Sequence, residues 1–140
     1  MDEILNNWVV NENVSNIEIL NFSIKQKINE LSIPLKGYET FVNWDLINPS
    51  YNFFYDFEGN EIEIKERLEK SKLNECEFLI IDIGYNNQMI KVSTSFFIEK
   101  WEDFVASNGF TGIFIFSEEG DFFMEFTDDS SYQLYSNFII

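Results

Sequence analysis

The fold of this chain is decided by residues 78–127, which read FLIIDIGYNNQMIKVSTSFFIEKWEDFVASNGFTGIFIFSEEGDFFMEFT. Apolar runs at 78–83 and 89–92 flank the turn-forming segment GYNN and predict a β-hairpin. Runs at 111–116 and 122–127, joined by SEEGD, predict a second hairpin. Because the first run of each hairpin is apolar on both faces, we expect these two runs to form central strands that are covered on both sides.

The segment between the two hairpins has the period of a helix. Its apolar residues fall at i, i+4, i+7 and i+8: Phe97, Trp101, Phe104 and Val105. A hydroxyl residue among 93–95 is placed to cap the first turn, and Asn108-Gly109 suits the last turn. The second half of the chain therefore predicts a ββαββ arrangement.

Helical signals dominate the first third of the chain. Residues 2–9 begin with two acids and continue with an apolar stripe, which is typical of a helix N-terminus. Ser23 and Gln26 fit a capping box ahead of a second helix that ends before Pro34. Residues 60–73 predict a charged helix, although their apolar alternation leaves a short initial strand open.

Two other segments complete the expected fold. The aromatic run at 51–57 is compatible with a strand or with an aromatic-rich loop, and 132–140 predicts a further strand. No internal repeat or linker divides the sequence. We therefore expect one α+β domain over residues 1–140: an antiparallel sheet of about five strands, with a ββαββ C-terminal half and a helical N-terminal region.

Net charge is the most unusual property of the sequence. Its 140 residues include 25 acids and 9 bases, which gives a formal net charge of −16. Nucleic-acid phosphates and anionic membrane surfaces both attract clustered Lys and Arg, so this composition disfavours direct binding to either. The complementary partner is a basic protein.

The sequence also allows a prediction of the cellular compartment. No apolar run approaches the ~18 residues that a membrane span needs. Asp2 and Glu3 stand where a signal peptide would carry positive charge. A single cysteine, Cys76, suits a reducing compartment. We expect a cytoplasmic protein.

The acids cluster towards the C-terminus. Beyond Lys100 the sequence has eight acids and no Lys or Arg, and six of these acids lie in 118–129. Carboxylates that only keep an aromatic-rich protein soluble need no clustering, and self-repulsion opposes it. The cluster therefore predicts a binding surface, with solubility as the alternative interpretation.

An aromatic side chain accompanies this cluster. In a strand, Phe122, Met124 and Phe126 share one face, and Phe123 shares the other face with carboxylates. Phe123 is then a binding anchor, unless a helix covers this face and buries it. We expect the binding surface to comprise Glu118, Glu119, Asp121, Phe123, Glu125, Asp128, Asp129, Tyr132 and Tyr135.

The residue inventory leaves little catalytic chemistry. The absence of histidine removes imidazole acid–base catalysis, His-dependent nucleophiles and imidazole metal ligands. Cys76 lies between Glu75 and Glu77, whose negative field opposes thiolate formation. Paired carboxylates leave a glycosidase-like hydrolase as a minor alternative. We expect no enzyme activity, no cofactor and no metal site.

The segment STSFFIEKWEDFVASNGFTGIFIFSEEGDFFMEF, residues 93–126, in a small, acidic, histidine-free α+β protein, resembles the immunity proteins of bacterial toxin–immunity pairs. The resemblance is to those of contact-dependent growth inhibition in particular, covers residues 76–140 and rests on general character. It implies a cognate toxin, often a basic nuclease, that the immunity protein holds inactive in the cytoplasm.

A DNA-mimic protein is the alternative from another functional class. It would occupy the groove of a nucleic-acid-binding protein, with carboxylates in place of phosphates. DNA carries one charge per about 1.7 Å of its axis, so a mimic needs a long, dense double row of acids. This sequence shows one short cluster, which favours an immunity protein.

Overall fold

The computed structural model describes residues 3–38, 40–55, 59–85, 87–108, 112–127 and 132–140. With η for a 3-10 helix, its first elements are η1 (Glu3–Asn6), α1 (Trp8–Glu12), η2 (Val14–Asn16), β1 (Ile17–Leu20), α2 (Ile24–Leu31), β2 (Leu35–Tyr38), β3 (Thr40–Val42), η3 (Trp44–Leu46) and β4 (Tyr51–Phe54). The remaining elements are α3 (Glu61–Lys70), η4 (Lys72–Glu75), β5 (Phe78–Asp82), β6 (Met89–Ser93), α4 (Thr94–Glu99), α5 (Trp101–Ser107), β7 (Ile113–Ser117), β8 (Phe123–Thr127) and β9 (Gln133–Ser136).

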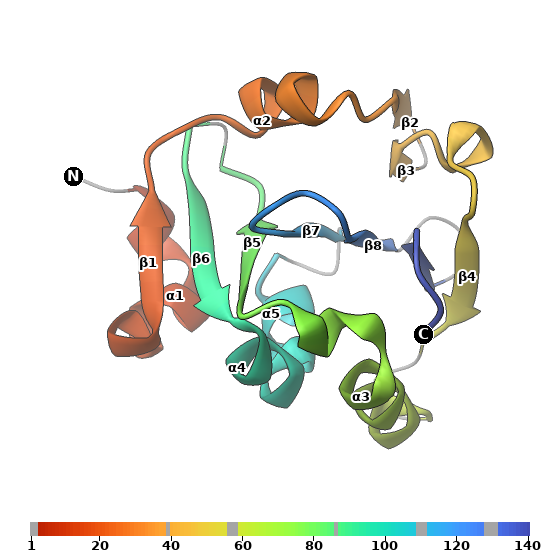
Figure 1. Cartoon of the computed structure of the whole chain (residues 1–140). Helices are drawn as coiled ribbons and strands as arrows, with labels where there is room; N and C mark the ends of the chain where they lie inside the picture. Colours follow the sequence, from red (N-terminus) through yellow and green to blue (C-terminus); the bar gives the residue numbers. More distant parts are fainter. Residues whose placement is uncertain (1–2, 39, 56–58, 86, 109–111, 128–131) are drawn as a thin grey trace.

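Seven strands form one antiparallel sheet in the order β1-β6-β5-β7-β8-β9-β4 (Figure 1). The hairpins β5–β6 and β7–β8 lie at its centre, and β5 pairs with β7 to join them. β1 extends the sheet beyond β6, while β9 and then β4 extend it beyond β8. Strands β2 and β3 form a separate two-stranded sheet. The α+β class and the antiparallel sheet are confirmed, but the sheet has seven strands and not about five.

The predicted ββαββ unit is present, with a difference in its helix. Ser93 caps α4, because its hydroxyl accepts a hydrogen bond from the Phe96 amide (3.2 Å). Lys100 then leaves helical geometry, with φ −115° and ψ 19°, and α5 begins at Trp101. The apolar spacing therefore located the buried stripe correctly but predicted one helix where there are two.

The N-terminal region is less helical than predicted. Ser23 does cap α2 by accepting a hydrogen bond from the Gln26 amide (3.2 Å). Before α2, however, the chain forms only short helices and then the edge strand β1, which pairs with β6. Four residues are too few for periodicity to separate a strand from a helix. Residues 51–54 of the aromatic run form a strand, β4, while residues 56 and 57 of that run lie outside the described residues. The charged segment at 60–73 contains helix α3.

The sheet separates two hydrophobic cores. Helices α1, α3, α4 and α5 cover one face, where Trp101 and Phe104 are fully buried (Figure 1). On the other face α2, the β2–β3 hairpin and η3 cover the sheet and contribute buried residues such as Val42 and Trp44. Because alternate residues of a strand point to opposite faces, β5 and β7 contribute to both cores. Their predicted position, central and covered on both sides, is confirmed.

Candidate binding surface

The exposed acids of the predicted surface lie at the turn between β7 and β8, here called the acidic turn (residues 118–121). Glu118, Glu119 and Asp121 are all exposed. Glu118 forms an ion pair with Lys91 of β6 (Oε2 to Nζ, 2.9 Å). Among the residues that the structure describes, no ion pair involves Glu119 or Asp121. Glu119 and Asp121 are therefore exposed carboxylates without an ion pair in the described part of the chain.

The acidic turn is held in a defined position. Gly120 has φ +85°, and a Cβ at this position would collide with the side chain of Leu31 in α2. Only glycine combines this left-handed backbone with so close an approach. The Gly120 amide donates to the Ser117 carbonyl (2.9 Å), and the Ser117 hydroxyl accepts from the Phe122 amide (3.1 Å). The exposed carboxylates therefore stand on a turn that is packed against α2.

Phe123 is a core residue in this structure. The predicted alternation holds, since Met124 and Phe126 lie in the core beneath the helices and Phe123 lies in the opposite one. The indole ring of Trp44 covers it, with ring centroids 5.5 Å apart, and leaves it 8% exposed. The covering elements are η3 and α2 with the β2–β3 hairpin. Phe123 is therefore not an accessible anchor, and the alternative that a helix covers and buries it is observed, although the β2–β3 hairpin contributes to the cover.

Glu125 is also buried, which corrects its predicted place on the partner surface. It is 6% exposed. Its Oε2 accepts a hydrogen bond from the Phe41 amide (2.7 Å), and its Oε1 accepts from the Val42 amide and the Trp44 indole Nε1 (3.0 Å each). This carboxylate fastens β3 and η3 to the sheet, and its charge is not available to a partner.

Two other predicted contact residues are aromatic, and Tyr135 pairs with Glu125 in the middle of β8. Tyr132 is 37% exposed. Tyr135 of β9 is half-buried and stacks on Trp44, with ring centroids 5.6 Å apart and an interplanar angle of 16°. Asp128 and Asp129 lie outside the described residues. Of the predicted residues that the structure describes, Glu118, Glu119 and Asp121 come together at one exposed turn, whereas Phe123, Glu125 and Tyr135 gather around Trp44 beneath its cover.

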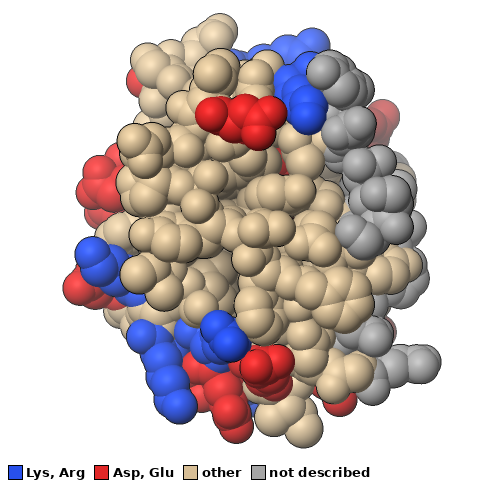
Figure 2. Space-filling model, turned by 90° about the vertical axis from the view of Figure 1, so that its right-hand side faces the viewer, with Lys and Arg blue, Asp and Glu red and all other residues tan. Residues whose placement is uncertain are grey.

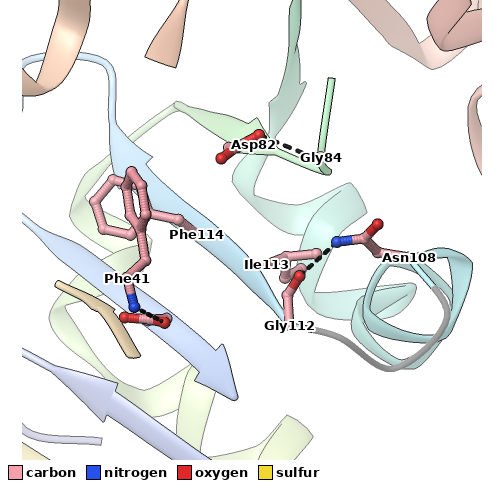
Figure 3. A pocket seen from close by; sticks show the side chains of 8 residues that line it. Phe41, Asp82, Gly84, Asn108, Gly112, Ile113 and Phe114 are labelled. Atoms are coloured by element: carbon pink, nitrogen blue, oxygen red, sulfur yellow. Dashed lines mark hydrogen bonds between the residues drawn. The ribbon is translucent and has the colours of Figure 1, made fainter. Parts of the chain in front are cut away.

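Figure 3 shows a pocket on the Glu125 face that the sequence analysis missed. Asp82 of β5 pairs with Phe114 of β7, and Phe114 pairs with Glu125 of β8, so these three residues form a row across the sheet. Phe41 packs over Phe114, with ring centroids 5.6 Å apart, and Asn108 lines the far side. The pocket has a volume of about 210 Å³. The sequence did contain a signal for this pocket, because a single acid interrupts each of two apolar strands: Asp82 in β5 and Glu125 in β8.

Burial raises the pKa of both carboxyl groups in this pocket. For Asp82, desolvation outweighs the hydrogen bond that its Oδ1 accepts from the Gly84 amide (3.0 Å). For Glu125, desolvation outweighs the three hydrogen bonds that lower its pKa. A carboxyl group with a raised pKa binds its proton more tightly in the folded protein than in the unfolded chain. Ionisation of these two acids therefore opposes folding at neutral pH.

We expect Asp82→Asn to raise the melting temperature at pH 7, because asparagine keeps an oxygen for the Gly84 amide but carries no charge. The protonated carboxyl of Asp82 makes its full contribution to stability below the pKa of ~3.9 that it has in the unfolded chain. This contribution is lost as the pH rises through the higher pKa that the group has in the folded protein. The advantage of the variant should therefore shrink towards pH 4. Thermal unfolding between pH 4 and 8 measures it, with the exposed Asp121→Asn as control. An Asp82→Asn variant less stable than the parent at pH 7 contradicts this interpretation.

Cys76 lies close behind the acidic turn and is buried. Burial is the main cause that raises the pKa of its thiol, and the negative charges of Glu119, Glu75 and Asp121 add to the effect. The direction is the predicted one, against thiolate formation, but its main cause is burial and not the negative field of Glu75 and Glu77 on which the prediction rested.

A second surface feature is the face over β4 and η3. Figure 2 shows uncharged residues across the centre of this face, with Asp, Glu, Lys and Arg gathered towards its edges. Leu46, Tyr51 and Phe54 are exposed, by 68%, 39% and 51%. The chain has 25 acids, but few charges lie at the centre of this face. A protein that binds here would therefore meet a small desolvation cost.

Within the described ranges, no three or more His, Cys, Asp or Glu side chains are grouped so that they could hold a metal ion. No helix of that same part of the chain has the length and hydropathy to cross a membrane. A comparison with protein-family models gives no match, and a comparison with curated proteins gives none either.

Proposed function

We propose that this chain is an immunity protein, a stoichiometric inhibitor that binds and neutralises a cognate toxin domain in the cytoplasm of the cell that makes it. The observation that carries the proposal is the acidic turn. It packs against α2 and carries three exposed carboxylates, in a chain of net charge −16. The toxin that fits best is a basic nuclease. A nuclease site is electropositive because it holds phosphate, so an acidic surface both attracts it and complements it.

The way the acidic turn is built supports a binding role. Leu31 and the hydrogen bonds of Ser117 fix its backbone, so little conformational entropy remains to be lost when a partner binds. The uncharged face over β4 and η3 offers additional surface with few charges to desolvate. Fixed carboxylates and nearby apolar surface are the components of a fast and tight protein inhibitor.

Co-expression with the toxin domain encoded by the adjacent gene tests this proposal. We expect the chain to restore growth to cells that make the toxin domain and to copurify with it in a 1:1 complex. The control is an unrelated acidic protein of similar size, which should not protect. An adjacent gene without a toxin domain, or a toxin domain that the chain neither binds nor neutralises, contradicts the proposal.

A carboxylate-dependent hydrolase is a second candidate, because Asp82 and Glu125 line one pocket and burial raises the pKa of both. Two observations weigh against it. Both oxygens of Glu125 accept hydrogen bonds from the protein itself. The pocket volume of about 210 Å³ falls below the ~300 to 1,000 Å³ of most small-molecule sites. Glycoside hydrolysis by the parent that Asp82→Asn abolishes would favour the hydrolase, and we expect no hydrolysis.

A DNA mimic has less support. Of the predicted acids, Glu125 is buried, and Glu118, Glu119 and Asp121 lie at one turn. A mimic needs carboxylates spaced along a double row, at the charge density of about one per 1.7 Å that DNA has.

A further inference from the structure

A groove opens beside the acidic turn. One wall is formed by residues 31–34, at the end of α2, and the other by residues 46–49, at the end of η3. Phe123 and Asn137 complete the lining. The walls supply mainly Leu, Ile and Pro side chains around a volume of about 350 Å³. We call this feature the α2–η3 groove.

The acidic turn forms one rim of the α2–η3 groove. Leu31, which lines the groove, is the side chain against which Gly120 of the turn packs. Asn137, which lines the groove, is also hydrogen-bonded to the turn and to Phe123. Its Nδ2 donates to the Asp121 carbonyl (3.0 Å), and its Oδ1 accepts from the Phe123 amide (2.9 Å). The position of the turn relative to the groove is therefore set by direct contacts.

Exposed acids occur in the segments next to the groove. Glu119 and Asp121 are exposed on the turn, and Asp45 of η3, which precedes Leu46 in the sequence, is also exposed. The three segments that form the groove and the turn, 31–34, 46–49 and 118–123, contain no Lys or Arg. The α2–η3 groove thus has Leu, Ile and Pro side chains beside polar groups in its walls, and exposed carboxylates in the adjoining segments.

We propose that the α2–η3 groove is the docking site for a segment of the partner protein that presents one large apolar side chain flanked by Lys or Arg. This inference rests on the proposed function and names the contact through which it works. The apolar side chain would displace water from the Leu, Ile and Pro walls. The flanking cations would meet Glu119, Asp121 and Asp45 beside the groove. An apolar anchor enclosed by paired charges has the organisation of a binding hot spot.

Charge distinguishes this occupant from a second copy of the chain. A second copy would bring the same carboxylates to the rim and add like-charge repulsion between two molecules of net charge −16. A basic partner gains attraction at the same positions. The groove volume also lies near the small end of ligand sites, which suits one or two side chains.

Leu46→Asn tests the proposal, because Leu46 lines the groove and is 68% exposed. The substitution removes apolar contact without changing charge or the buried core. Ile62→Asn is the matched control, since Ile62 is exposed by the same 68% but lies in α3, on the other side of the sheet. The probe is the toxin domain encoded by the adjacent gene. We expect the Kd to rise by about tenfold or more for Leu46→Asn, through faster dissociation, and to stay within about twofold for Ile62→Asn.

The outcomes separate this proposal from the proposed function. If the toxin domain binds the parent and both variants equally well, the docking site is wrong and the inhibitor function stands. If the toxin domain does not bind the parent, both proposals fail. If sedimentation shows a parent dimer that Leu46→Asn dissociates, the occupant is a second copy, which overturns the assigned partner. Circular dichroism of each variant confirms that it is folded before binding is compared.

Discussion

Replacing Glu125 with alanine should lower the free energy of unfolding by about 2 to 6 kcal/mol, because two of its three donors are buried and each buried donor left without an acceptor costs about 1 to 3 kcal/mol. The donors are the amides of Phe41 and Val42 and the indole of Trp44. Urea unfolding of the variant and the parent measures the difference. The loss should be largest in the β2–β3 hairpin and η3, since Glu125 fastens these elements to the sheet.

Two further variants control this experiment. Glu119→Ala removes an exposed carboxylate and should change the free energy of unfolding by less than about 0.5 kcal/mol. Glu125→Gln keeps the side-chain size and one acceptor oxygen but turns an amide donor towards the donors of β3, so its loss should be intermediate. If Glu125→Ala unfolds within about 1 kcal/mol of the parent, this carboxylate does not hold the hairpin to the sheet.

Reversing the acidic turn by changing Glu118, Glu119 and Asp121 together to Lys should weaken toxin binding by about 2 to 5 kcal/mol, which is about 30-fold to about 4,000-fold in Kd. Three attractive charges become repulsive, and any Lys or Arg of the toxin that they meet is left unpaired. The fold should survive because all three side chains are exposed. Surface plasmon resonance with the toxin domain measures both rate constants, and thermal unfolding checks stability.

A matched triple variant separates location from total charge. Glu63, Glu66 and Glu69 are exposed on α3, so changing them to Lys alters the net charge by the same amount on another face. This control should slow association only modestly. Equal losses in the two triple variants would show that net charge alone matters, and full binding by the acidic-turn variant would show that the interface lies elsewhere, with β4 as the next surface to examine.

The central part of the fold could be predicted from the sequence because its signals are local. The two apolar runs of each hairpin and the turn residues between them identify β5–β6 and β7–β8 directly. The break at Lys100 could not be predicted, since the apolar spacing continues through it. The edge strand β1 was missed for a related reason. Its four residues gain their conformation from pairing with β6 and not from their own pattern.

The candidate binding surface was predictable only where local sequence controls exposure. Glu118, Glu119 and Asp121 are exposed because turn residues lie at the protein surface. Alternation placed Phe123 and Glu125 on one face correctly but carried no information about what covers that face. The cover comes from Phe41, about 80 residues earlier in the sequence, and from its neighbours in β3 and η3. Long-range packing of this kind leaves no periodic signal in the strand itself.

We propose that this chain captures a basic toxin domain through carboxylates, and the association rate constant of the purified pair between about 0.05 and 0.5 M salt tests this directly. Over this range the Debye length falls from above 10 Å to below 5 Å, roughly. We expect the association rate to fall by about tenfold or more while the dissociation rate changes little, since screening removes the long-range attraction first. An association rate that does not depend on salt would contradict the claim.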